Sequence, residues 1–544
     1  MRDVRVPVEP RYPYRLSITA RTDDMRRVKA ADIPPTGETR VADPLAAAEE
    51  ARQNLSATLD PTRRSTLGQF FTPPATAQLM ASMSTLLRKR VRLLDAGAGV
   101  GALTAAWVAE ICSRPVRPKE VVLTAYELDE TLLPALRRTL TACEQACAVV
   151  GITCKWEVRA TDFIEAVVDT LDVGLFQTER SVFDVAILNP PYKKFRSESR
   201  TRQLLRRLNI ETSNLYTAFL ALVVLLLDES GELIAITPRS FCNGPYFRPF
   251  RQHLLQNVNL TRLHVFEARD HAFRDDEVLQ ENVILHAVKS LPQQPLVCVS
   301  QSRTPDDPIN VQRNVPFERV VRPGDSQAFI HLVPDDDGHA LAEAMETLPC
   351  TLDELGLCVS TGRVVDFRAK QWLRAEPTAG TVPLIYPTHF DSGLVRWPKA
   401  DTKKPSAIVH NTDSAPLMVP AGVYVLVRRF SAKEERRRVV AAVFDLSSVP
   451  YEVVGFENHL NYFHERGAPL DRTLAWGLSA FLNCSPLDTY FRQFNGHTQV
   501  NATDLRSLRY PTRAVLTALG HRIQGILPAQ DELDALVAEI LKVR

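Results

Sequence analysis

Short apolar runs alternate with segments of helical periodicity between about Leu93 and Val288. Runs of this length and composition predict buried strands. Seven strands are predicted: Val91–Asp95, Val121–Glu127, Lys155–Val158, Phe183–Leu188, Leu233–Thr237, Arg262–Phe266 and Asn282–Ala287. Strands that alternate with helices form an open, mostly parallel α/β sheet with helices on both faces. The last two strands are close enough in sequence to pair antiparallel at one edge.

The pattern changes on both sides of this α/β region. Residues 1–60 are rich in Arg, Pro and Asp, with one helix predicted over Pro44 to Ala57, and we interpret them as an extension. Residues 61–290 are expected to form the α/β domain. Residues 291–345, rich in Pro and Asp, predict a linker, and residues 346–544 predict a second domain of mixed α+β class.

Composition excludes several classes of protein. Lys and Arg number 65 against 64 Asp and Glu, so a wholly basic nucleic-acid coat is excluded, although a local basic groove is not. The nine cysteines include no C-x-x-C pair, which argues against a disulfide framework or a structural zinc and fits a reducing cytoplasm. The longest apolar stretch, Ala218 to Leu227, is shorter than the roughly 20 residues that span a bilayer, so no membrane partner is expected.

A glycine-rich turn follows the first predicted strand. The strand ends in Asp95, and Gly97, Gly99 and Gly101 then precede a helical segment. Glycines remove side chains where a bound molecule must approach the backbone closely. The spacing is G-x-G-x-G, which differs from the G-x-G-x-x-G of dinucleotide enzymes. The sequence therefore predicts a ligand site at this turn.

The next two strands add acidic and aromatic residues. The second ends in Glu127, whose carboxylate could bind a ribose diol, and the third leads to Asp162 and Phe163, a carboxylate and a ring suited to adenine. No phosphate-binding G-x-x-x-x-G-K-[ST] loop is present in the sequence. A nucleoside that carries no phosphate fits these residues, and we expect S-adenosylmethionine as the cofactor.

The fourth predicted strand ends in Asn189, Pro190, Pro191 and Tyr192. Two prolines fix φ and stop the strand, so Asn189 and Tyr192 project rigidly from the sheet edge where α/β proteins bind ligands. An exocyclic amine is a poor nucleophile because its lone pair is delocalised into the ring. Hydrogen bonds to the Asn189 side-chain oxygen and the Pro190 carbonyl would favour a pyramidal nitrogen, and Tyr192 would stack on the base. The target base must then leave the duplex stack.

Together these motifs resemble the gamma-class DNA adenine-N6 methyltransferases of type II restriction–modification systems, from Leu67 to the C-terminus. The resemblance implies a Rossmann-like methyltransferase domain with a mostly parallel seven-stranded sheet and a C-terminal target-recognition domain. The segment Leu67–Pro74 resembles one that closes the cofactor pocket, which implicates Phe71 and Thr72 at the methionine end.

Further motifs of that family follow along the chain. The segment Ser240–Arg251 resembles the motif whose aromatic residue sandwiches the flipped adenine, a role that we assign to Phe247 rather than Tyr246. Three segments of the second domain resemble the target-recognition half of such enzymes. They are Ser360–Val365, Phe456–Asn461 and Gly496–Asp504.

Positive charge is concentrated directly after Tyr192. Residues 193–208 hold seven basic residues and one acid, a charge of +6 in a chain of +1, and we expect Lys193, Lys194, Arg196, Arg200 and Arg202 to contact DNA. A solvated charged helix is the alternative. A second patch, Arg428 to Arg438, implicates Arg428 and Arg429, although Lys433 to Arg437 can pair along a helix.

Histidines of the second domain are assigned to DNA contact or to packing. His497 lies in a loop, Gly496 to Thr498, that we expect to contact DNA. His459, His464 and His497 lack the spacing of metal ligands, so hydrogen-bonding or packing roles are expected and no metal site is predicted.

The favoured hypothesis is a sequence-specific DNA methyltransferase that modifies adenine N6 in duplex DNA. A cognate restriction endonuclease, encoded separately, would be its functional partner, and the protein is expected to act as a monomer. A protein-glutamine or RNA amino-methyltransferase is a second possibility, because such enzymes also carry Asn-Pro-Pro-Tyr. A non-catalytic DNA-specificity factor is a third, and the intact Asn-Pro-Pro-Tyr motif argues against it.

Overall fold

The fold is described from a computed structural model of the chain. The described residues are 43–58, 71–172, 182–196, 198–266, 281–290, 292–332, 336–399, 403–431, 435–446, 450–494, 499–523 and 525–541. The predictions for residues 1–42, for Leu67–Phe70 and for His497 lie outside them. None of the described helices is long and apolar enough to cross a membrane.

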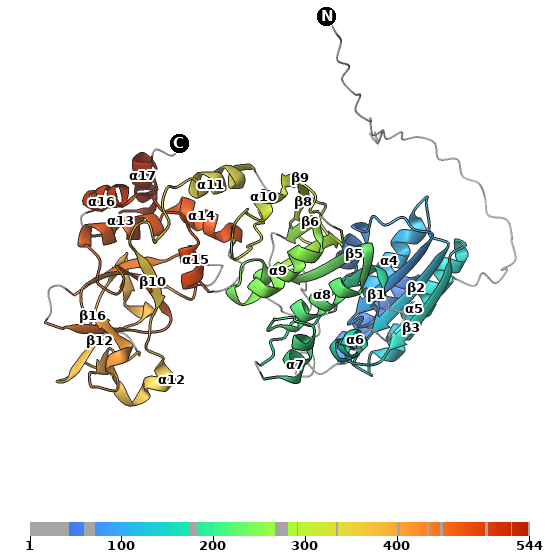
Figure 1. The fold of residues 1–544 in the computed structure, drawn as a ribbon, viewed down its shortest axis with the longest axis horizontal. Coiled ribbons are helices and arrows are strands. Elements are labelled where there is room, and N and C mark those ends of the chain that lie inside the picture. The colour runs from blue at the N-terminus through green and yellow to red at the C-terminus, as the bar shows by residue number, and fades with distance from the viewer. Residues whose placement is uncertain are drawn as a thin grey trace, which may run out of the picture. The chain divides into compact units, whose positions relative to one another are not determined.

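A nine-stranded sheet dominates the first part of the chain, in the order β3-β2-β1-β4-β5-β7-β6-β8-β9 (Figure 1). Its strands are β1 (Arg90–Ala96), β2 (Glu120–Tyr126), β3 (Thr153–Arg159), β4 (Phe183–Leu188), β5 (Leu227–Pro238), β6 (Asn259–Phe266), β7 (Asn282–Val288), β8 (Leu296–Ser302) and β9 (Val311–Pro316). Strands β3, β2, β1, β4 and β5 run parallel, and β7 pairs antiparallel with both β5 and β6. The α/β class and the seven predicted strands are confirmed.

The expected strand count and linker need correction. The sheet has nine strands rather than seven, because β8 and β9 come from the segment 291–345 that composition marked as a linker. Strand β8 pairs with β6 and β9 pairs with β8, so the antiparallel β6–β7 pair is present but does not form the edge. A short helix, α10 (Phe317–Val320), follows β9, and α11 (Asp336–Glu346) lies beyond it.

Helices cover both faces of the sheet because side chains alternate between the faces along each strand. Leu93 belongs to one apolar core and the next residue, Leu94, to the other. The Leu93 face is covered by α1 (Pro44–Thr58), α3 (Pro74–Ser82), α4 (Ala102–Ser113) and α5 (Leu133–Val149). The Leu94 face is covered by α6 (Phe163–Asp172), α7 (Arg200–Arg207), α8 (Leu215–Leu226) and α9 (Arg248–Asn257). The helix predicted over Pro44 to Ala57 is thus confirmed as α1.

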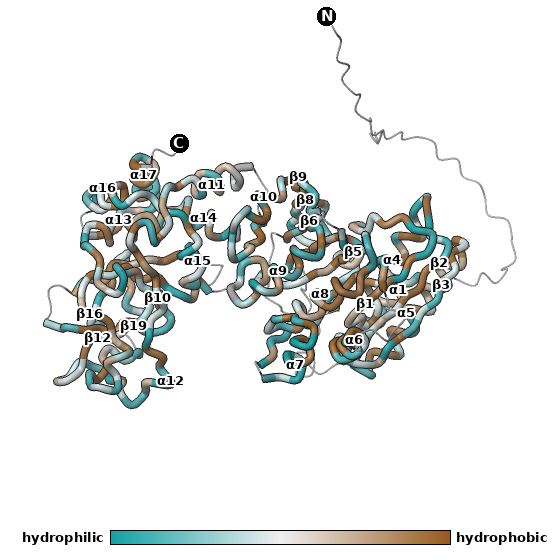
Figure 2. Tube along the Cα trace, viewed as in Figure 1, coloured by the Kyte–Doolittle hydropathy of each residue, from teal (hydrophilic) through white to brown (hydrophobic). Residues whose placement is uncertain are grey.

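Helix α8 is the most hydrophobic of these helices. Almost all of its residues are buried, and Figure 2 shows the contrast between this apolar helix and the hydrophilic α7 that precedes it. An all-apolar helix is stable only when protein surrounds it. Helix α8 therefore anchors the core behind the carboxyl ends of β1 and β4.

The second part of the chain combines two sheets with helices, as predicted for a mixed α+β region. The six-stranded sheet has the order β10-β20-β17-β18-β14-β13, and the five-stranded sheet has the order β11-β15-β12-β19-β16. The strands are β10 (Cys358–Thr361), β11 (Leu373–Arg374), β12 (Thr381–Ile385), β13 (Phe390–Asp391), β14 (Leu394–Val395), β15 (Ala407–Val409), β16 (Met418–Pro420), β17 (Val423–Arg428), β18 (Ala441–Asp445), β19 (Val453–Phe456) and β20 (Leu460–His464). The helices are α12 (Asp366–Ala369), α13 (Arg472–Leu482), α14 (Ser485–Phe494), α15 (Ala502–Arg506), α16 (Arg513–Arg522) and α17 (Gln530–Leu541).

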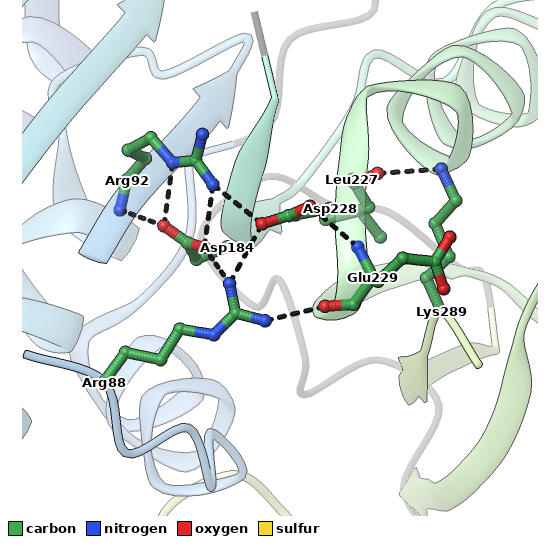
Figure 3. A network of polar contacts seen from close by, with 7 residues as sticks. All are labelled: Arg88, Arg92, Asp184, Leu227, Asp228, Glu229 and Lys289. Atoms are coloured by element: carbon green, nitrogen blue, oxygen red, sulfur yellow. Dashed lines mark hydrogen bonds and ion pairs between the residues drawn. The ribbon is translucent and has the colours of Figure 1, made fainter. Parts of the chain in front are cut away.

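The amino edge of the parallel strands carries a charge network (Figure 3). Arg92 contacts Asp184 Oδ2 at 2.9 Å and Asp228 Oδ2 at 2.9 Å, and Arg88 contacts the same two aspartates. Burial of Asp184 opposes its ionisation, but hydrogen bonds and charge from Arg92 and Arg88 outweigh it and lower its pKa. These ion pairs join the loop before β1 to the starts of β1, β4 and β5.

Candidate active site at the carboxyl edge of the sheet

Strands β1 and β4 are neighbours, with Leu93 beside Val185, although β2 and β3 come between them in the sequence. The strand order reverses here, and in open α/β sheets the carboxyl ends at such a switch point form the ligand site. The glycine turn leaves β1 and the Asn189–Tyr192 segment leaves β4 at this edge. A Cβ built on Gly97 would lie 3.9 Å from Pro191 Cδ, which shows how close the two motifs are.

The glycine turn needs its glycines for backbone conformation. Gly97, Gly99 and Gly101 have φ values of 79°, 56° and 84°, in the left-handed region that residues with a Cβ rarely adopt. The Gly97 and Ala98 N–H groups both donate to the Tyr126 carbonyl at 2.9 Å, which fastens the turn to the end of β2. The three glycines therefore place no side chain of their own on this turn.

Asp95 is a buried acid at the base of the turn, 1% exposed. Its Oδ2 accepts a hydrogen bond from Thr104 Oγ1 at 2.7 Å, and its Oδ1 has no hydrogen-bond partner among the described residues. Burial raises the pKa of Asp95 to about 7, with the hydrogen bonds from Thr104 opposing the rise. A cationic group placed beside Asp95 would satisfy this carboxyl group.

Glu127, at the end of β2, organises the same turn. Its Oε2 accepts from the Gly99 N–H at 2.8 Å, and its Oε1 accepts from the Asp129 N–H at 2.7 Å. Burial raises the pKa of Glu127, although these backbone donors partly offset the effect. The carboxylate thus holds the glycine turn against β2, and each of its oxygens keeps a further lone pair for a ligand hydroxyl.

Asp162 and Phe163 are the two residues expected at the adenine ring. The Asp162 side chain caps α6 by accepting from the Glu165 N–H at 3.0 Å. The Phe163 ring is buried, with its centroid 5.1 Å from that of Tyr126 and 4.9 Å from that of Phe219. In this structure Phe163 therefore packs in the core directly beneath the site, and Asp162 lies at its border.

The segment that precedes the glycine turn contacts both motifs. A Cβ on Gly99 would lie 3.7 Å from the Phe71 ring, so Phe71 packs on the turn. Asn189 Nδ2 donates to Thr72 Oγ1 at 3.1 Å. Phe71 and Thr72, predicted to close the cofactor pocket, thus connect the glycine turn to the residue predicted to bind the amine.

Tyr192 starts a row of aromatic rings. Its hydroxyl donates to the Ile236 carbonyl at 3.2 Å, and its ring centroid lies 6.1 Å from that of Tyr216, edge to face. The Tyr216 ring in turn lies 5.7 Å from Phe247. Burial raises the pKa of Tyr192 well above its usual value, so this tyrosine stays protonated. The row links the ends of β4 and β5.

The two aromatic candidates after β5 differ sharply in exposure. Both lie in η3 (Pro245–Phe247), which follows η2 (Arg239–Cys242) at the end of β5. Phe247 is 6% exposed and packs in the core, whereas Tyr246 is 72% exposed. Phe247 thus lies in the aromatic row with Tyr192, and Tyr246 presents its ring outward.

Two residues of α8 were missed by the sequence analysis. Tyr216 lies between Tyr192 and Phe247, and the Phe219 ring lies 3.7 Å from a Cβ built on Gly97. The apolar run Ala218 to Leu227 contains Phe219, and Tyr216 lies two residues before it. That run was considered only as a membrane span, so neither aromatic residue was assigned to the site.

Much of the positive charge after Tyr192 is neutralised locally. Four arginines on α7 pair with acids of α6 or of the segment just after α7. The pairs are Arg200 with Glu165, Arg202 and Arg206 with Glu211, and Arg207 with Asp169 and Asp172. Lys194 and Arg196 are exposed and form no ion pair with another described residue, and Lys193 is also exposed. The basic surface beside the site is therefore mainly the stretch 193–196.

The three motifs predicted to recognise the target come together in the second part of the chain. Thr361 Oγ1 donates to Asn461 Oδ1 at 3.0 Å, and Asn461 Nδ2 donates to the Val500 carbonyl at 2.7 Å. Gly362 passes so close to Phe456–Asn461 that a Cβ would lie 2.1 Å from the Glu457 carbonyl oxygen. Segments far apart in sequence thus form one packed unit around buried Asn461.

The second basic patch borders this unit. Arg428 pairs with Glu435 at 3.0 Å, and the Arg429 guanidinium donates to the Asn458 carbonyl at 3.2 Å. His464 is buried and its Nε2 lies 2.9 Å from Ser360 Oγ. No group of three or more His, Cys, Asp or Glu side chains within the described ranges could hold a metal ion.

Comparison with known proteins adds the following similarities. The model of the Eco57I restriction-modification methylase family matches residues 151–273. The chain is 42% identical to type II methyltransferase M.PstI of Providencia stuartii over 495 residues, 91% of this chain and 97% of the relative. It is 45% identical to type II methyltransferase M.BsuBI of Bacillus subtilis over 487 residues, 88% and 94% of the two chains. The type IIL restriction–modification enzyme MmeI, solved in complex with DNA, shares the fold with a TM-score of 0.52 at 10% identity, over 92% of this chain and 74% of its own.

Proposed function

Because the chain belongs to the type II methyltransferases of restriction–modification systems, we propose that it transfers a methyl group from S-adenosylmethionine to the N6 amino group of adenine in duplex DNA. One observation carries this proposal. The glycine turn and the Asn189–Tyr192 segment meet at the switch point of the sheet, with Gly97 beside Pro191. A loop suited to a nucleoside therefore lies next to a motif suited to an amine.

Asn189 is the residue that holds the amine. The hydrogen bond from its Nδ2 to Thr72 fixes the orientation of the amide, so that Oδ1 is the atom that accepts from the adenine amine. The Pro190 carbonyl accepts the second N–H. Two acceptors in fixed positions favour a pyramidal nitrogen and direct its lone pair, which contributes mainly orientation to the reaction.

The residues around the glycine turn fit S-adenosylmethionine. The buried Asp95 carboxyl suits the ammonium or sulfonium charge, and Glu127 suits the ribose hydroxyls. Three glycines with positive φ leave the turn open to close approach. When bound, S-adenosylmethionine supplies an electrophilic methyl group, so the protein needs to provide position rather than a further activating group.

Duplex DNA reaches the site only with its target adenine flipped out of the helix. Tyr192 stacks on the flipped base and Phe247 completes the pocket, while Lys193, Lys194 and Arg196 bind the backbone phosphates next to it. The packed unit of the three C-terminal motifs reads the sequence. We further propose that methylation protects DNA from a separately encoded restriction endonuclease and that the protein acts as a monomer.

The test is a transfer assay with cofactor labelled in its methyl group. The protein is incubated in parallel with duplex DNA, RNA and bulk protein, and the labelled DNA is hydrolysed to nucleosides. Label in N6-methyl-2′-deoxyadenosine, and in the DNA sample alone, is the expected result. Label in N4-methyl-2′-deoxycytidine would overturn the choice of base, and label in RNA or protein would overturn the choice of polymer.

A further inference from the structure

His459, for which the sequence predicts only a packing or hydrogen-bonding role, lies on the surface of the packed unit formed by the three C-terminal motifs. Its side chain is 48% exposed, whereas its partner Glu457 is 1% exposed. His459 Nδ1 bonds to Glu457 Oε1, and the His459 backbone N–H donates to Glu457 Oε2 at 2.9 Å. One oxygen of the buried carboxylate thus bonds to the imidazole, and the other bonds to the backbone of the same residue.

The backbone of Glu457 and Asn458 is held by neighbouring segments. Gly362 leaves room for the Glu457 carbonyl, because any Cβ at residue 362 would lie 2.1 Å from it. The Glu457 N–H donates to the Ile385 carbonyl at 3.1 Å, and the Asn458 N–H donates to the Val364 carbonyl at 2.8 Å. The loop from residue 457 to 459 is therefore fixed by neighbouring segments, and the imidazole direction is fixed with it.

Two further side chains adjoin His459 on the same surface. The Phe430 ring, 40% exposed, lies with its centroid 4.9 Å from the imidazole. The Arg429 guanidinium lies 5.9 Å from the Phe430 ring, and the Arg429 N–H donates to the His459 carbonyl at 2.8 Å. We call Arg429, Phe430 and His459 the His459 patch. It joins a cation, an exposed ring and an oriented imidazole.

The hydrogen bond at Nδ1 determines what His459 can offer. With Nδ1 bonded to the carboxylate, Nε2 is the remaining ring nitrogen, and it has no hydrogen-bond partner among the described residues. Burying a carboxylate is unfavourable unless it is paired, and holding a surface ring in one orientation loses entropy. A ring nitrogen held in position for a ligand accounts for both features.

We propose that His459 is a DNA-contact residue that forms a hydrogen bond through Nε2 with the duplex, with Glu457 as its positioning residue. This inference rests on the proposed function, because it assumes that the C-terminal part binds the target DNA. Two groups of the duplex could be the partner, a backbone phosphate oxygen and a base edge in the major groove.

The test measures equilibrium binding of two duplexes to the full-length protein. One duplex carries the sequence found methylated in DNA from cells that produce the protein, and the other carries the same bases in scrambled order. The variants are His459→Gln and Glu457→Gln, and His410→Gln is the control because His410 is also an exposed histidine of the C-terminal part. Thermal midpoints and cofactor affinity are measured for every protein.

A loss of about 5-fold or more in affinity for the methylated sequence is expected for His459→Gln, with a smaller loss for Glu457→Gln and none for His410→Gln. If the partner is a base, the loss is confined to that sequence. If it is a phosphate, both duplexes lose affinity. The thermal midpoint of His459→Gln should stay that of the wild type, since the side chain is half exposed.

Two outcomes would overturn the inference, and they have different meanings. If the wild type binds duplex DNA and His459→Gln binds each duplex as tightly as the wild type does, His459 only stabilises its loop, and the proposed function stands. If the wild type itself binds no duplex DNA, the proposed function fails and the role of His459 fails with it.

Discussion

Two buried aspartates on neighbouring strands of one sheet have opposite ionisation behaviour. Asp184, 2% exposed, lies at the amino edge, where hydrogen bonds from Arg92 outweigh its desolvation and lower its pKa. Asp95, 1% exposed, lies at the carboxyl edge, where burial raises its pKa to about 7. The difference lies in their partners, since Asp184 contacts two arginines and Asp95 contacts one threonine.

This contrast indicates a division of labour within the sheet. At the amino edge charges compensate one another and tie the loop before β1 to three strands, which serves stability. At the carboxyl edge a carboxyl group is buried with little compensation, a pattern typical of functional sites. Changes at the two edges should therefore separate into those that alter turnover and those that alter folding.

The largest effect is expected for Asn189→Ala at the carboxyl edge. Removing the amide takes away the acceptor proposed to orient the target amine, and a fall in kcat of at least about 100-fold is expected, comparable with the loss of one oriented catalytic donor. Cofactor affinity and the thermal midpoint should change little. Full retention of kcat would contradict the role of Asn189, and a large drop in thermal midpoint would mean that this edge also carries stability.

Asp184→Ala at the amino edge should lower stability and leave kcat nearly unchanged. It leaves Arg88 and Arg92 with only Asp228 as a carboxylate partner in the network, and a loss of about 3 kcal/mol in the free energy of unfolding is expected for a broken buried pair. Below the melting transition, kcat and cofactor affinity should stay close to wild type. Denaturant unfolding and steady-state kinetics of the same variant check this prediction. An unchanged unfolding midpoint would contradict the stabilising role of the amino edge.

The pH dependence of stability provides a smaller and more specific test. The folded pKa of Asp95 is about 7, above the value of about 3.9 for an unfolded aspartate, so between these values the folded state binds a proton that the unfolded state does not. Stability without cofactor should therefore fall as pH rises from about 4 to 7, by up to about 1.4 kcal/mol per pH unit from this residue. Asp95→Asn should flatten that decline. Equal slopes for the two proteins would show that Asp95 ionises normally.

The smallest expected effect concerns the basic stretch. Replacing Lys194 and Arg196 with alanine should lower the slope of log DNA affinity against log salt by about 1.8, two phosphate contacts at about 0.9 each. The matched control replaces Arg206 and Arg207, which already pair with acids, and should change the slope less. Similar changes in both double variants would mean that the ion pairs open when DNA binds.

The sequence predicted the central strands and the turns that leave them because the residue types within each segment already indicate its structure. The run Phe183–Leu188 is apolar throughout and is buried on both faces of the sheet. The proximity of Gly97 to Pro191 followed from the general rule that parallel strands end at one edge. Local chemistry and a general rule of topology were therefore enough for the centre of the site.

The remaining features depend on partners that are distant in the sequence. Strand β9 is mostly polar, and both β8 and β9 lie between Pro- and Asp-rich stretches, which hid the short apolar run Leu296–Val299 of β8; the pairing partners of both strands have no local signal. The charge of residues 193–208 was overestimated as a free surface because Glu165 and Asp172 lie on the preceding helix. The burial of Phe163 likewise depends on Phe219.

The close passage of Gly362 over Glu457 has a consequence for how such a protein could acquire a new DNA specificity. There is no space for even a methyl group between the two backbones, so the segments Ser360–Val365 and Phe456–Asn461 lie in direct backbone contact. If these segments read DNA as proposed, new target sequences would arise from the side chains that this scaffold presents. A single segment grafted from a relative would pack against residues that do not fit it, whereas all three segments exchanged together would keep their contacts with one another.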